Sequence, residues 1–267
     1  YFVVRKSYKT NELLCNLVTT SSGLETFDLQ KFALFLKGIF GARLAGLLHT
    51  INDETGDRTI ATSGSINLVY GKDKIVEELL DLDFEISMKS FFQTNPKCAE
   101  KLYNKVVEYV LEDTSKVDNT IVMDLFCGTG TIGQIVASKS KNAKIVGVDI
   151  VASAINDAQK NAKRNQIEGV QFFAADVGKF LTAHPEYENK IKTIILDPAR
   201  AGIAPKTLQK IIHLNADRMV YVSCNPATQA RDTVLLNEAG YALKKISLVD
   251  QFPHTAHIET VVLFEKC

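Results

Sequence analysis

Hydrophobic and polar positions follow one pattern in the front of the chain and another in the rest. Residues 1 to about 85 contain short apolar or alternating runs broken by polar turns, which is typical of strands. One segment between them, "DLQKFALFLKGIF", has helical spacing at Leu29, Phe32, Leu36 and Ile39. The strand-like runs are "YFVVRKS", "ELLCNLVTT", "LAGLLHTI" and "SINLVYG". The pattern predicts a small α+β domain over residues 1–87.

From residue 120 onward, strand-like runs alternate with helix-like runs. The strand-like runs are "TIVMDLF", "KIVGVDI", "VQFFAAD", "IKTIILDP" and "DRMVYVSC". The helix-like runs begin near Thr131, Ala152, Val177, Pro205 and Pro226. This alternation predicts an α/β fold in which helices cover both faces of a parallel sheet.

The two ends of this second region differ from the alternation. The runs "ALKKISLVD" and "HIETVVLFEK" have no helix between them, so we expect a hairpin that puts one antiparallel strand into the sheet. Before the first strand, Asn95-Pro96 starts a helix. Its predicted apolar stripe is Leu102, Val106, Val107 and Val110. We therefore assign residues 88–267 to one domain.

Composition narrows the classes of protein without choosing one. Lys+Arg and Asp+Glu balance at 31 each, so the whole chain has no basic excess that would indicate a nucleic-acid partner. No run of about 18 apolar residues predicts a membrane span. The five cysteines are scattered without CxxC spacing, which indicates a reducing compartment and neither a metal site nor a disulfide framework. We expect a cytoplasmic protein, with an organelle as the alternative.

The first residues read as the middle of a strand, and there is no initiator Met. We therefore expect the chain to be part of a longer protein.

Five chemically active side chains end the five strand-like runs of the second region. Ligands of open α/β sheets bind beyond the carboxyl ends of the strands, so these side chains predict a site. They are Asp124, Asp149, Asp176, Asp197 and Cys224. Each one alone is also typical of a loop or helix-cap residue.

The segment "DLFCGTGTIG", residues 124–133, contains Gly128, Gly130 and Gly133 at the spacing of a dinucleotide-binding loop. Asp149 follows about 20 residues later, which suits ribose hydroxyls of either a nicotinamide cofactor or S-adenosylmethionine (SAM). A pyrophosphate needs a helix N-terminus free of competing negative charge. Because Asp124 stands before the glycines and SAM carries a cation, we predict SAM.

Cys224 lies between a buried strand and a helix that begins at Pro226, where the helix N-terminus would stabilise a thiolate. The alternative is an inert thiol that closes the sheet. Methyl transfer to C5 of a pyrimidine needs such a nucleophile, because a thiolate that adds to C6 makes C5 enolate-like. A base must then remove the C5 proton. The candidates for this base are His254, His257 and Glu259. Partial burial would raise the pKa of Glu259 toward a useful range. The histidines could instead be core or capping groups.

Five ordered motifs support the same interpretation: "SFFQTNP", "DLFCGTGTIG", "LDPARAGI", "YVSCNPATQARD" and "FPHTAHIETVVLFEK". They resemble the SAM-dependent RNA uridine-C5 methyltransferases, which make 5-methyluridine in tRNA and ribosomal RNA. The resemblance extends from about residue 88 to the C-terminus and implies a class I SAM-methyltransferase fold, a Rossmann-like sheet with an antiparallel last strand. The front part resembles the central α+β domain of that family.

The resemblance implies a role for individual residues. Cys224 would be the nucleophile of the covalent adduct and Glu259 the base. Asp197 would lie between the cofactor and the target base, and Arg200 would help to hold RNA. Phe252 and His254 are candidates for stacking on the base or for packing. The SAM contacts that we predict are Gln93, Phe126, Gly128, Thr131, Asp149, Asp176 and Asp197.

The chain departs from the family pattern at its front. Many members carry an OB-like RNA-binding domain there, and some carry a four-cysteine iron–sulfur cluster; the 267 residues include neither. The motifs "DPARAG" and "SCNPATQARD" look closer to the ribosomal-RNA members, so we favour ribosomal RNA over tRNA as the substrate of a monomeric enzyme without a metal or a membrane partner. The alternatives are a nitrogen-directed methyltransferase, a nicotinamide oxidoreductase and a non-catalytic RNA-binding protein.

Overall fold

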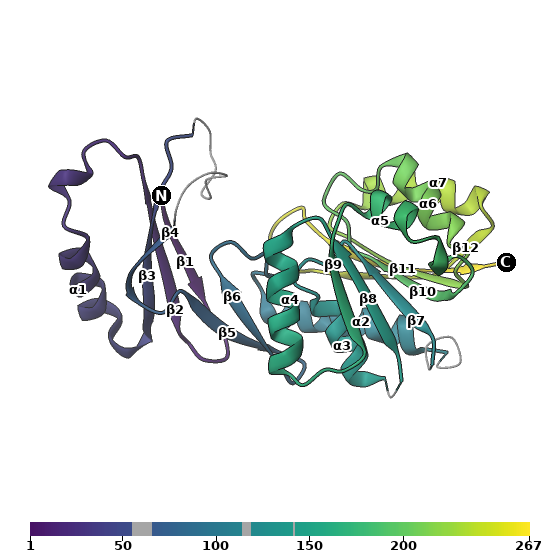
Figure 1. The fold of residues 1–267 in the computed structure, drawn as a ribbon, viewed down its shortest axis with the longest axis horizontal. Coiled ribbons are helices and arrows are strands. Elements are labelled where there is room, and N and C mark those ends of the chain that lie inside the picture. Colours follow the sequence, from purple (N-terminus) through teal and green to yellow (C-terminus); the bar gives the residue numbers. More distant parts are fainter. Residues whose placement is uncertain (55–65, 114–118, 141) are drawn as a thin grey trace. The chain divides into compact units, whose positions relative to one another are not determined.

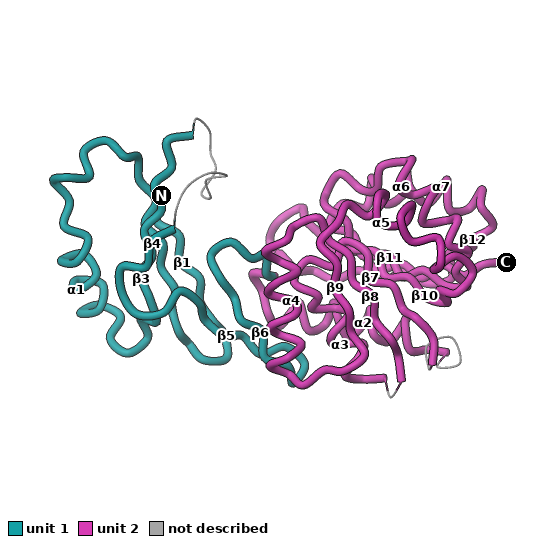
Figure 2. Tube along the Cα trace, in the orientation of Figure 1, with its two compact units in different colours: residues 1–92 teal, residues 93–267 magenta. Residues whose placement is uncertain are grey.

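The computed structural model describes residues 1–54, 66–113, 119–140 and 142–267. The chain divides into two compact units, residues 1–92 and residues 93–267 (Figure 2). The change of hydrophobic pattern along the sequence predicts this division between residues 87 and 88. In the described part of the chain, no helix has the length and apolar character needed to cross a membrane.

The first unit is built on a four-stranded sheet in the order β1-β2-β3-β4. The pairs β1/β2 and β3/β4 are antiparallel, whereas β2/β3 is parallel and is connected through helix α1. The side chain of Asp28 caps α1 by accepting from the amide of Lys31 at 2.9 Å. The four strands and the helix predicted here are confirmed: β1 Phe2–Lys6, β2 Leu13–Thr19, α1 Leu29–Phe40, β3 Leu44–Ile51 and β4 Ile66–Gly71, with short 3₁₀ turns at Leu24–Thr26 and Gly41–Arg43.

The sequence analysis missed a hairpin in this unit, formed by β5 (Lys74–Leu79) and β6 (Leu82–Ser87). Its inward face includes Glu77, which is 1% exposed, so the expected apolar alternation is interrupted by an acid. The Glu77 carboxylate accepts from the amides of Tyr8 at 2.5 Å and Lys9 at 2.9 Å, which compensates for its burial.

The second unit contains a seven-stranded sheet in the order β12-β13-β11-β10-β7-β8-β9 (Figure 1). The pairs β11/β10, β10/β7, β7/β8 and β8/β9 are parallel, and β13 is antiparallel to both of its neighbours. The predicted hairpin with one antiparallel strand is therefore confirmed. The strands are β7 Ile121–Leu125, β8 Lys144–Asp149, β9 Val170–Ala174, β10 Ile191–Leu196, β11 Arg218–Ser223, β12 Tyr241–Val249 and β13 Glu259–Lys266.

Helices cover both faces of this sheet, as the alternation predicts. Helices α5, α6 and α7 lie together over one face, and α2, α3 and α4 lie on the other (Figure 1). Each helix predicted to follow a strand begins at the expected residue. The helices are α2 Pro96–Leu111, α3 Thr131–Lys139, α4 Ala152–Arg164, α5 Val177–Ala183, α6 Pro205–His213 and α7 Pro226–Glu238, with a 3₁₀ turn at Pro185–Tyr187.

Three of the four residues in the predicted stripe of helix α2 are buried: Leu102, Val106 and Val110. Val107 is only half-buried, whereas Tyr103 and Tyr109 are 6% and 3% exposed. The prediction counted aliphatic residues alone, but a tyrosine can bury its ring where its hydroxyl finds a partner. The Tyr109 hydroxyl lies 2.7 Å from Ser247 Oγ of β12, and Tyr103 extends toward the carboxyl edge of the sheet, where the predicted site residues lie.

Candidate active site

The topology gathers the predicted site residues at one edge of the second unit's sheet. Asp124, Asp149, Asp176, Asp197 and Cys224 lie at or directly after the carboxyl ends of five parallel strands. Glu259 reaches the same edge from the opposite direction, because it begins the antiparallel strand β13. Since Ser223 of β11 pairs with Thr260 of β13, Cys224 and Glu259 follow and precede the same rung of the ladder.

The glycine loop turns sharply between β7 and α3. Phe126, Gly128 and Gly130 all have positive φ, at 63°, 54° and 67°. At Gly130 an added Cβ would lie 2.5 Å from the Phe172 ring, whereas at Gly128 it would meet nothing within 4 Å. Gly130 is therefore needed for packing, and Gly128 faces open space where a ligand can approach the backbone.

Asp124 lies beneath this loop, 1% exposed. Its Oδ2 accepts from the Gly133 amide at 3.0 Å, and an added Cβ at Gly133 would lie 2.8 Å from that oxygen. Burial raises the pKa of Asp124 to about 7, against the lowering effect of that hydrogen bond. Its other oxygen is buried with no hydrogen-bond partner among the described residues. The acid therefore supports the first turn of α3, and its negative charge is weaker than the sequence argument assumed.

Asp149, Asp176 and Thr131 all make local contacts beside the loop. Asp149 accepts from the Gly128 amide at 2.9 Å and from the Val151 amide at 2.8 Å. Asp176 is exposed and caps α5 by accepting from the Lys179 amide at 2.9 Å. Thr131 Oγ1 lies 3.1 Å from Thr129 Oγ1. Each carboxylate oxygen keeps a second lone pair, so these contacts leave room for a ligand's hydroxyl or amino donors.

A second cluster of acidic side chains, formed by Asp197 and Glu259, lies toward Cys224. Burial, together with the neighbouring carboxyls of Glu259 and Asp124, raises the pKa of Asp197 to about 8. Glu259 is 5% exposed, and its burial raises its pKa, as the sequence analysis expected. Because the pKa values of both acids are raised, this part of the site is suited to proton exchange.

Tyr103 of α2 belongs to the same group and was missed as a site residue. Burial and the negative charges of Asp197, Glu259 and Asp124 raise its pKa, while a hydrogen bond with the Gln93 side chain lowers it. The contact places Gln93 beside the acidic group. Only its position on the buried stripe of α2 could have indicated Tyr103 in the sequence.

The surroundings of Cys224 oppose the stabilisation of a thiolate that the helix N-terminus would provide. Burial and the carboxyls of Glu259 and Asp197 raise the pKa of the Cys224 thiol. Its own backbone amide and the charge of Arg200 lower the pKa, but by less. The sequence argument counted the helix N-terminus and left out the two acids that the topology brings to the same edge.

Helix α7, which follows Cys224, connects the segments around the thiol. Gln229 donates to the Tyr221 carbonyl of β11 at 2.9 Å and accepts from the Thr260 hydroxyl of β13 at 2.7 Å. Asp232 is 1% exposed and accepts from the Ile203 amide and from the Tyr221 hydroxyl. These contacts fix the ends of β11 and β13 relative to the loop that follows Asp197.

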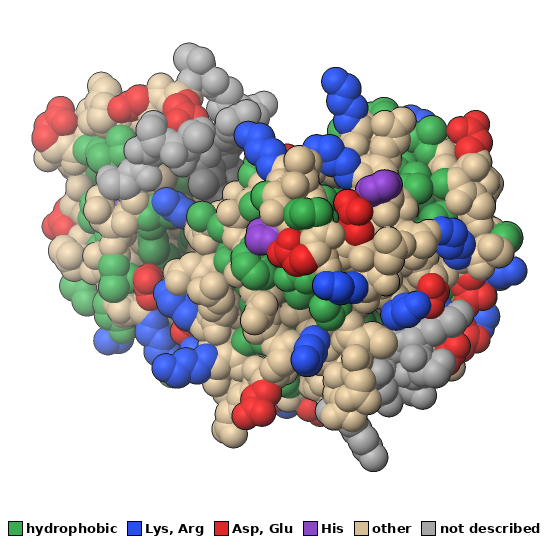
Figure 3. All heavy atoms as spheres, turned by 45° about the vertical axis from the view of Figure 1, so that its right-hand side comes forward, with side chains coloured by type: hydrophobic (Ala, Val, Ile, Leu, Met, Phe, Trp, Pro, Cys, Tyr) green, Lys and Arg blue, Asp and Glu red, His purple; other side chains and the backbone are tan. Residues whose placement is uncertain are grey.

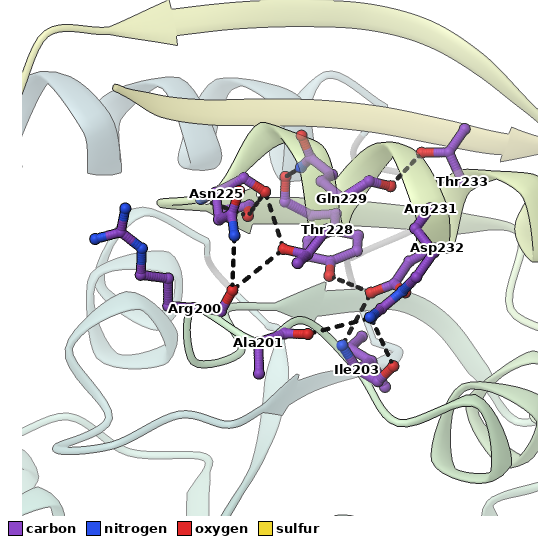
Figure 4. Close-up of polar contacts among 11 residues, drawn as sticks. Arg200, Ala201, Ile203, Asn225, Thr228, Gln229, Arg231, Asp232 and Thr233 are labelled. Atoms are coloured by element: carbon purple, nitrogen blue, oxygen red, sulfur yellow. Dashed lines mark hydrogen bonds and ion pairs between the residues drawn. The ribbon is translucent and has the colours of Figure 1, made fainter. Parts of the chain in front are cut away.

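The same helix holds the loop of residues 198–203, which we call the Arg200 loop (Figure 4). Arg231 pairs with Asp232 at 2.7 Å and donates to the carbonyls of Ala201 and Ile203 at 3.2 Å. An added Cβ at Gly202 would lie 2.7 Å from Arg231 Nη2. The motifs "DPARAGI" and "NPATQARD" therefore contact each other through these hydrogen bonds.

The segment from residue 250 to residue 258 carries the remaining candidates. His254 and His257 are both exposed, so neither is a core residue. The rings of Phe252 and His257 lie 6.3 Å apart, edge to face. Gln251 was missed. It is 1% exposed and donates to the Asn95 carbonyl at 3.2 Å and weakly to Gln93 at 3.4 Å, and its own side-chain oxygen has no partner among the described residues.

The face that Figure 3 presents mixes basic and acidic side chains, with hydrophobic groups between them. This agrees with the balanced composition of 31 basic and 31 acidic residues. Basic and acidic side chains are therefore interspersed on this face.

Comparison with known proteins identifies the family. The family model described as tRNA (uracil-5-)-methyltransferase matches residues 52–267. The chain belongs to this family. Its curated relatives include uncharacterised RNA methyltransferases from Clostridium acetobutylicum, 44% identical over 99% of this chain, and from Caldanaerobacter subterraneus, 42% identical over 100% of this chain. The chain spans 55% and 56% of these two relatives, about half of their length.

Solved structures agree with this family assignment. The tRNA (uracil-54, C5)-methyltransferase of Pyrococcus abyssi, crystallised with S-adenosyl-L-homocysteine, superposes with a TM-score of 0.75 at 30% identity. The match covers 99% of this chain and 59% of that one. The predicted class I, Rossmann-like methyltransferase fold, preceded by a small α+β part, is therefore confirmed.

Proposed function

We propose that this chain contains the catalytic part of an enzyme that transfers a methyl group from SAM to C5 of a uridine in RNA. Family membership supports the reaction class. The observation that carries the proposal is the strand register: Ser223 pairs with Thr260, so the thiol of Cys224 and the carboxyl of Glu259 meet at one edge. The glycine loop lies at the carboxyl edge of the same sheet.

The residues around the glycine loop fit the cofactor. Gly128 leaves open space beside its backbone, and Asp124 has a buried oxygen without a partner among the described residues. We assign Asp149 to the ribose hydroxyls, and Gln93, Phe126, Gly128, Thr131 and Asp176 to the remaining contacts of SAM. Asp197 would lie between the cofactor and the target base. When bound, SAM supplies the electrophilic methyl group and a positive charge.

The protein's own groups would carry the other steps. The Cys224 thiol releases its proton to solvent, and the sulfur adds to C6 of uracil, which gives C5 the electron density to take the methyl group. The Glu259 carboxylate then accepts the C5 proton, and the electron pair left behind expels the sulfur from C6. The target base must leave its stack to reach this edge. Asp197, with its pKa raised to about 8, can exchange protons with Glu259 during the cycle.

Two RNA classes remain to be separated by experiment. The "DPARAG" and "SCNPATQARD" motifs favour ribosomal RNA, whereas the family description and the Pyrococcus abyssi enzyme refer to tRNA. We retain ribosomal RNA as the prediction, and a monomeric cytoplasmic enzyme without a resident metal ion as its setting. Bacterial relatives described as RNA methyltransferases support RNA as the substrate.

The test is a trapping experiment on the full-length protein with labelled SAM and 5-fluorouridine-substituted cellular RNA. Fluorine at C5 cannot leave as a proton, so a Cys224–C6 adduct should accumulate. We expect a labelled protein–RNA band that is absent in Cys224→Ala, and sequencing of the trapped RNA identifies its class. Methylated RNA without such a band would refute the covalent mechanism and favour a nitrogen-directed methyltransferase.

A further inference from the structure

Gln251 is a buried residue that joins two distant segments of the second unit. It is 1% exposed and lies in the segment that leads to Glu259 and β13. Its Nε2 donates to the Asn95 carbonyl at 3.2 Å, and the Asn95 side chain donates to the Gln251 carbonyl at 3.4 Å. A reciprocal pair of contacts therefore holds the start of α2 against the segment before β13.

The side chain of Gln251 also contacts Gln93. Its Nε2 donates to Gln93 Oε1 at 3.4 Å, a long contact of the kind that is common in a ligand-free site. The two acceptors decide how the Gln251 amide lies, because turning it over would place its oxygen against two other oxygens. In this orientation Gln251 Oε1 is buried without a partner among the described residues. An unpaired buried oxygen costs stability, so packing alone does not account for a glutamine here.

The Gln93 amide is held at both of its ends. Its oxygen accepts from Gln251, and its side chain also hydrogen-bonds with the Tyr103 hydroxyl of α2. Since the contact with Gln93 lowers the pKa of Tyr103, Gln93 donates its N–H in that contact. The two contacts agree on which amide atom is the oxygen. The half-buried Gln93 keeps one N–H and one lone pair for a ligand, each in a fixed place.

We propose that Gln251 is a positioning residue for the cofactor, which fixes the orientation of the Gln93 amide while Tyr103 supports the same orientation from the other end. This inference rests on the proposed function, which assigns Gln93 to SAM. An unrestrained glutamine amide has two orientations and loses that freedom when a ligand binds. Holding the amide in one orientation beforehand lowers the cost of binding, so the affinity for SAM depends on a residue behind the contact.

Gln251→Met tests this role in the full-length protein, with S-adenosylhomocysteine as the probe and calorimetry as the measurement. Methionine has a similar length and no donor. We expect the affinity to fall about fivefold, the loss typical of one neutral hydrogen bond. The KM for SAM in methyl transfer should rise by a similar factor, while turnover at saturating SAM stays within about twofold.

The variant should fold as the wild type does. The Asn95 carbonyl keeps the Ala99 amide as a donor at 2.9 Å, and the Asn95 side chain keeps the backbone carbonyl of residue 251 as its acceptor. The substitution also removes the unpaired oxygen. We therefore expect the Tm to fall by no more than about 2 °C.

A double-mutant cycle shows whether Gln251 acts through Gln93. In Gln93→Ala, the addition of Gln251→Met should leave the affinity unchanged, since no amide remains to be oriented. Tyr103→Phe should weaken binding of S-adenosylhomocysteine as Gln251→Met does. Tyr109→Phe is its matched control, because it removes a buried hydroxyl of the same helix that contacts Ser247 instead. This control should bind with wild-type affinity.

Two results would overturn the inference. If Gln251→Met leaves the affinity unchanged, whatever its Tm, the residue serves only the structure. If it weakens binding as much in Gln93→Ala as in the wild type, it acts on the ligand independently of Gln93. Failure of the proposed function gives a different result, since the wild type would then bind S-adenosylhomocysteine and transfer no methyl group to RNA.

Discussion

Asp149 and Asp197 end two strands of the same sheet, and in the sequence each is an aspartate after a run of apolar residues. In the structure they differ. Asp149 binds two backbone amides, those of Gly128 and Val151, and stays in contact with solvent. Asp197 lies beside Glu259 and Asp124, and burial raises its pKa to about 8.

The difference follows from the neighbours that the fold supplies. Beside Asp149, the glycine loop provides N–H donors, which stabilise a carboxylate. At Asp197, β13 inserts beside β11 and brings another acid to an edge with few donors. The end of the edge at Asp149 is therefore suited to binding a ligand, and the end at Asp197 is suited to proton transfer.

The largest effect should come from Cys224→Ala, at the proton-transfer end. Without the sulfur no adduct can form, so we expect turnover to fall by at least about 10³-fold. The affinity for SAM, measured by calorimetry, should stay within about twofold, because the glycine loop is unchanged. Appreciable methyl transfer by this variant would show that Cys224 takes no covalent part in the reaction, so that both ends of the sheet edge serve only to bind ligands.

Glu259→Gln should separate addition from release. The amide cannot accept the C5 proton, so turnover should fall about 10²- to 10³-fold while a covalent protein–RNA complex accumulates on ordinary, unfluorinated RNA. Denaturing gels detect this complex. If turnover falls without accumulation, the base acts earlier, on the thiol.

Asp149→Asn should affect the binding end alone. Loss of the charge should weaken SAM binding about tenfold, because a hydrogen bond that a carboxylate accepts is stronger than one that an amide oxygen accepts, by about 1.4 kcal/mol. At saturating SAM, the rate of adduct formation with 5-fluorouridine RNA should be unchanged. If Asp149→Asn forms the adduct more slowly at saturating SAM, the two ends of the sheet edge do not have separate roles.

Asp197→Asn should have the smallest effect, on the pH dependence of stability. Below pH 4 the carboxyl is neutral in both the folded and the unfolded chain, since its ordinary pKa is 3.8. As the pH rises toward 8, the unfolded chain loses the proton and the folded one keeps it, so the wild type loses stability that the amide retains. The Tm advantage of the variant should therefore grow by about 3 °C or more between pH 5 and pH 8.

Much of the fold could be read from local patterns. The five helix starts of the second unit coincide with prediction, since Pro226 and Pro205 at first turns and Asp176 as a cap are local signals. The β5–β6 hairpin was missed because Glu77 occupies a buried position in its strand alternation. Tyr103 and Tyr109 were missed on α2 because their burial depends on partners from Gln93 and from β12.

The sequence by itself determined the order of strands and helices, the acids and the thiol that end them, and the motifs that identify the family. These features depend on neighbours a few residues apart. Only the tertiary structure decided the raised pKa of Cys224, the different environments of Asp149 and Asp197, and the contact of Arg231 and Asp232 with the Arg200 loop. Each depends on groups that are distant in the chain; for Cys224 and Asp197, Glu259 arrives because β13 inserts beside β11, and burial there shifts their pKa values.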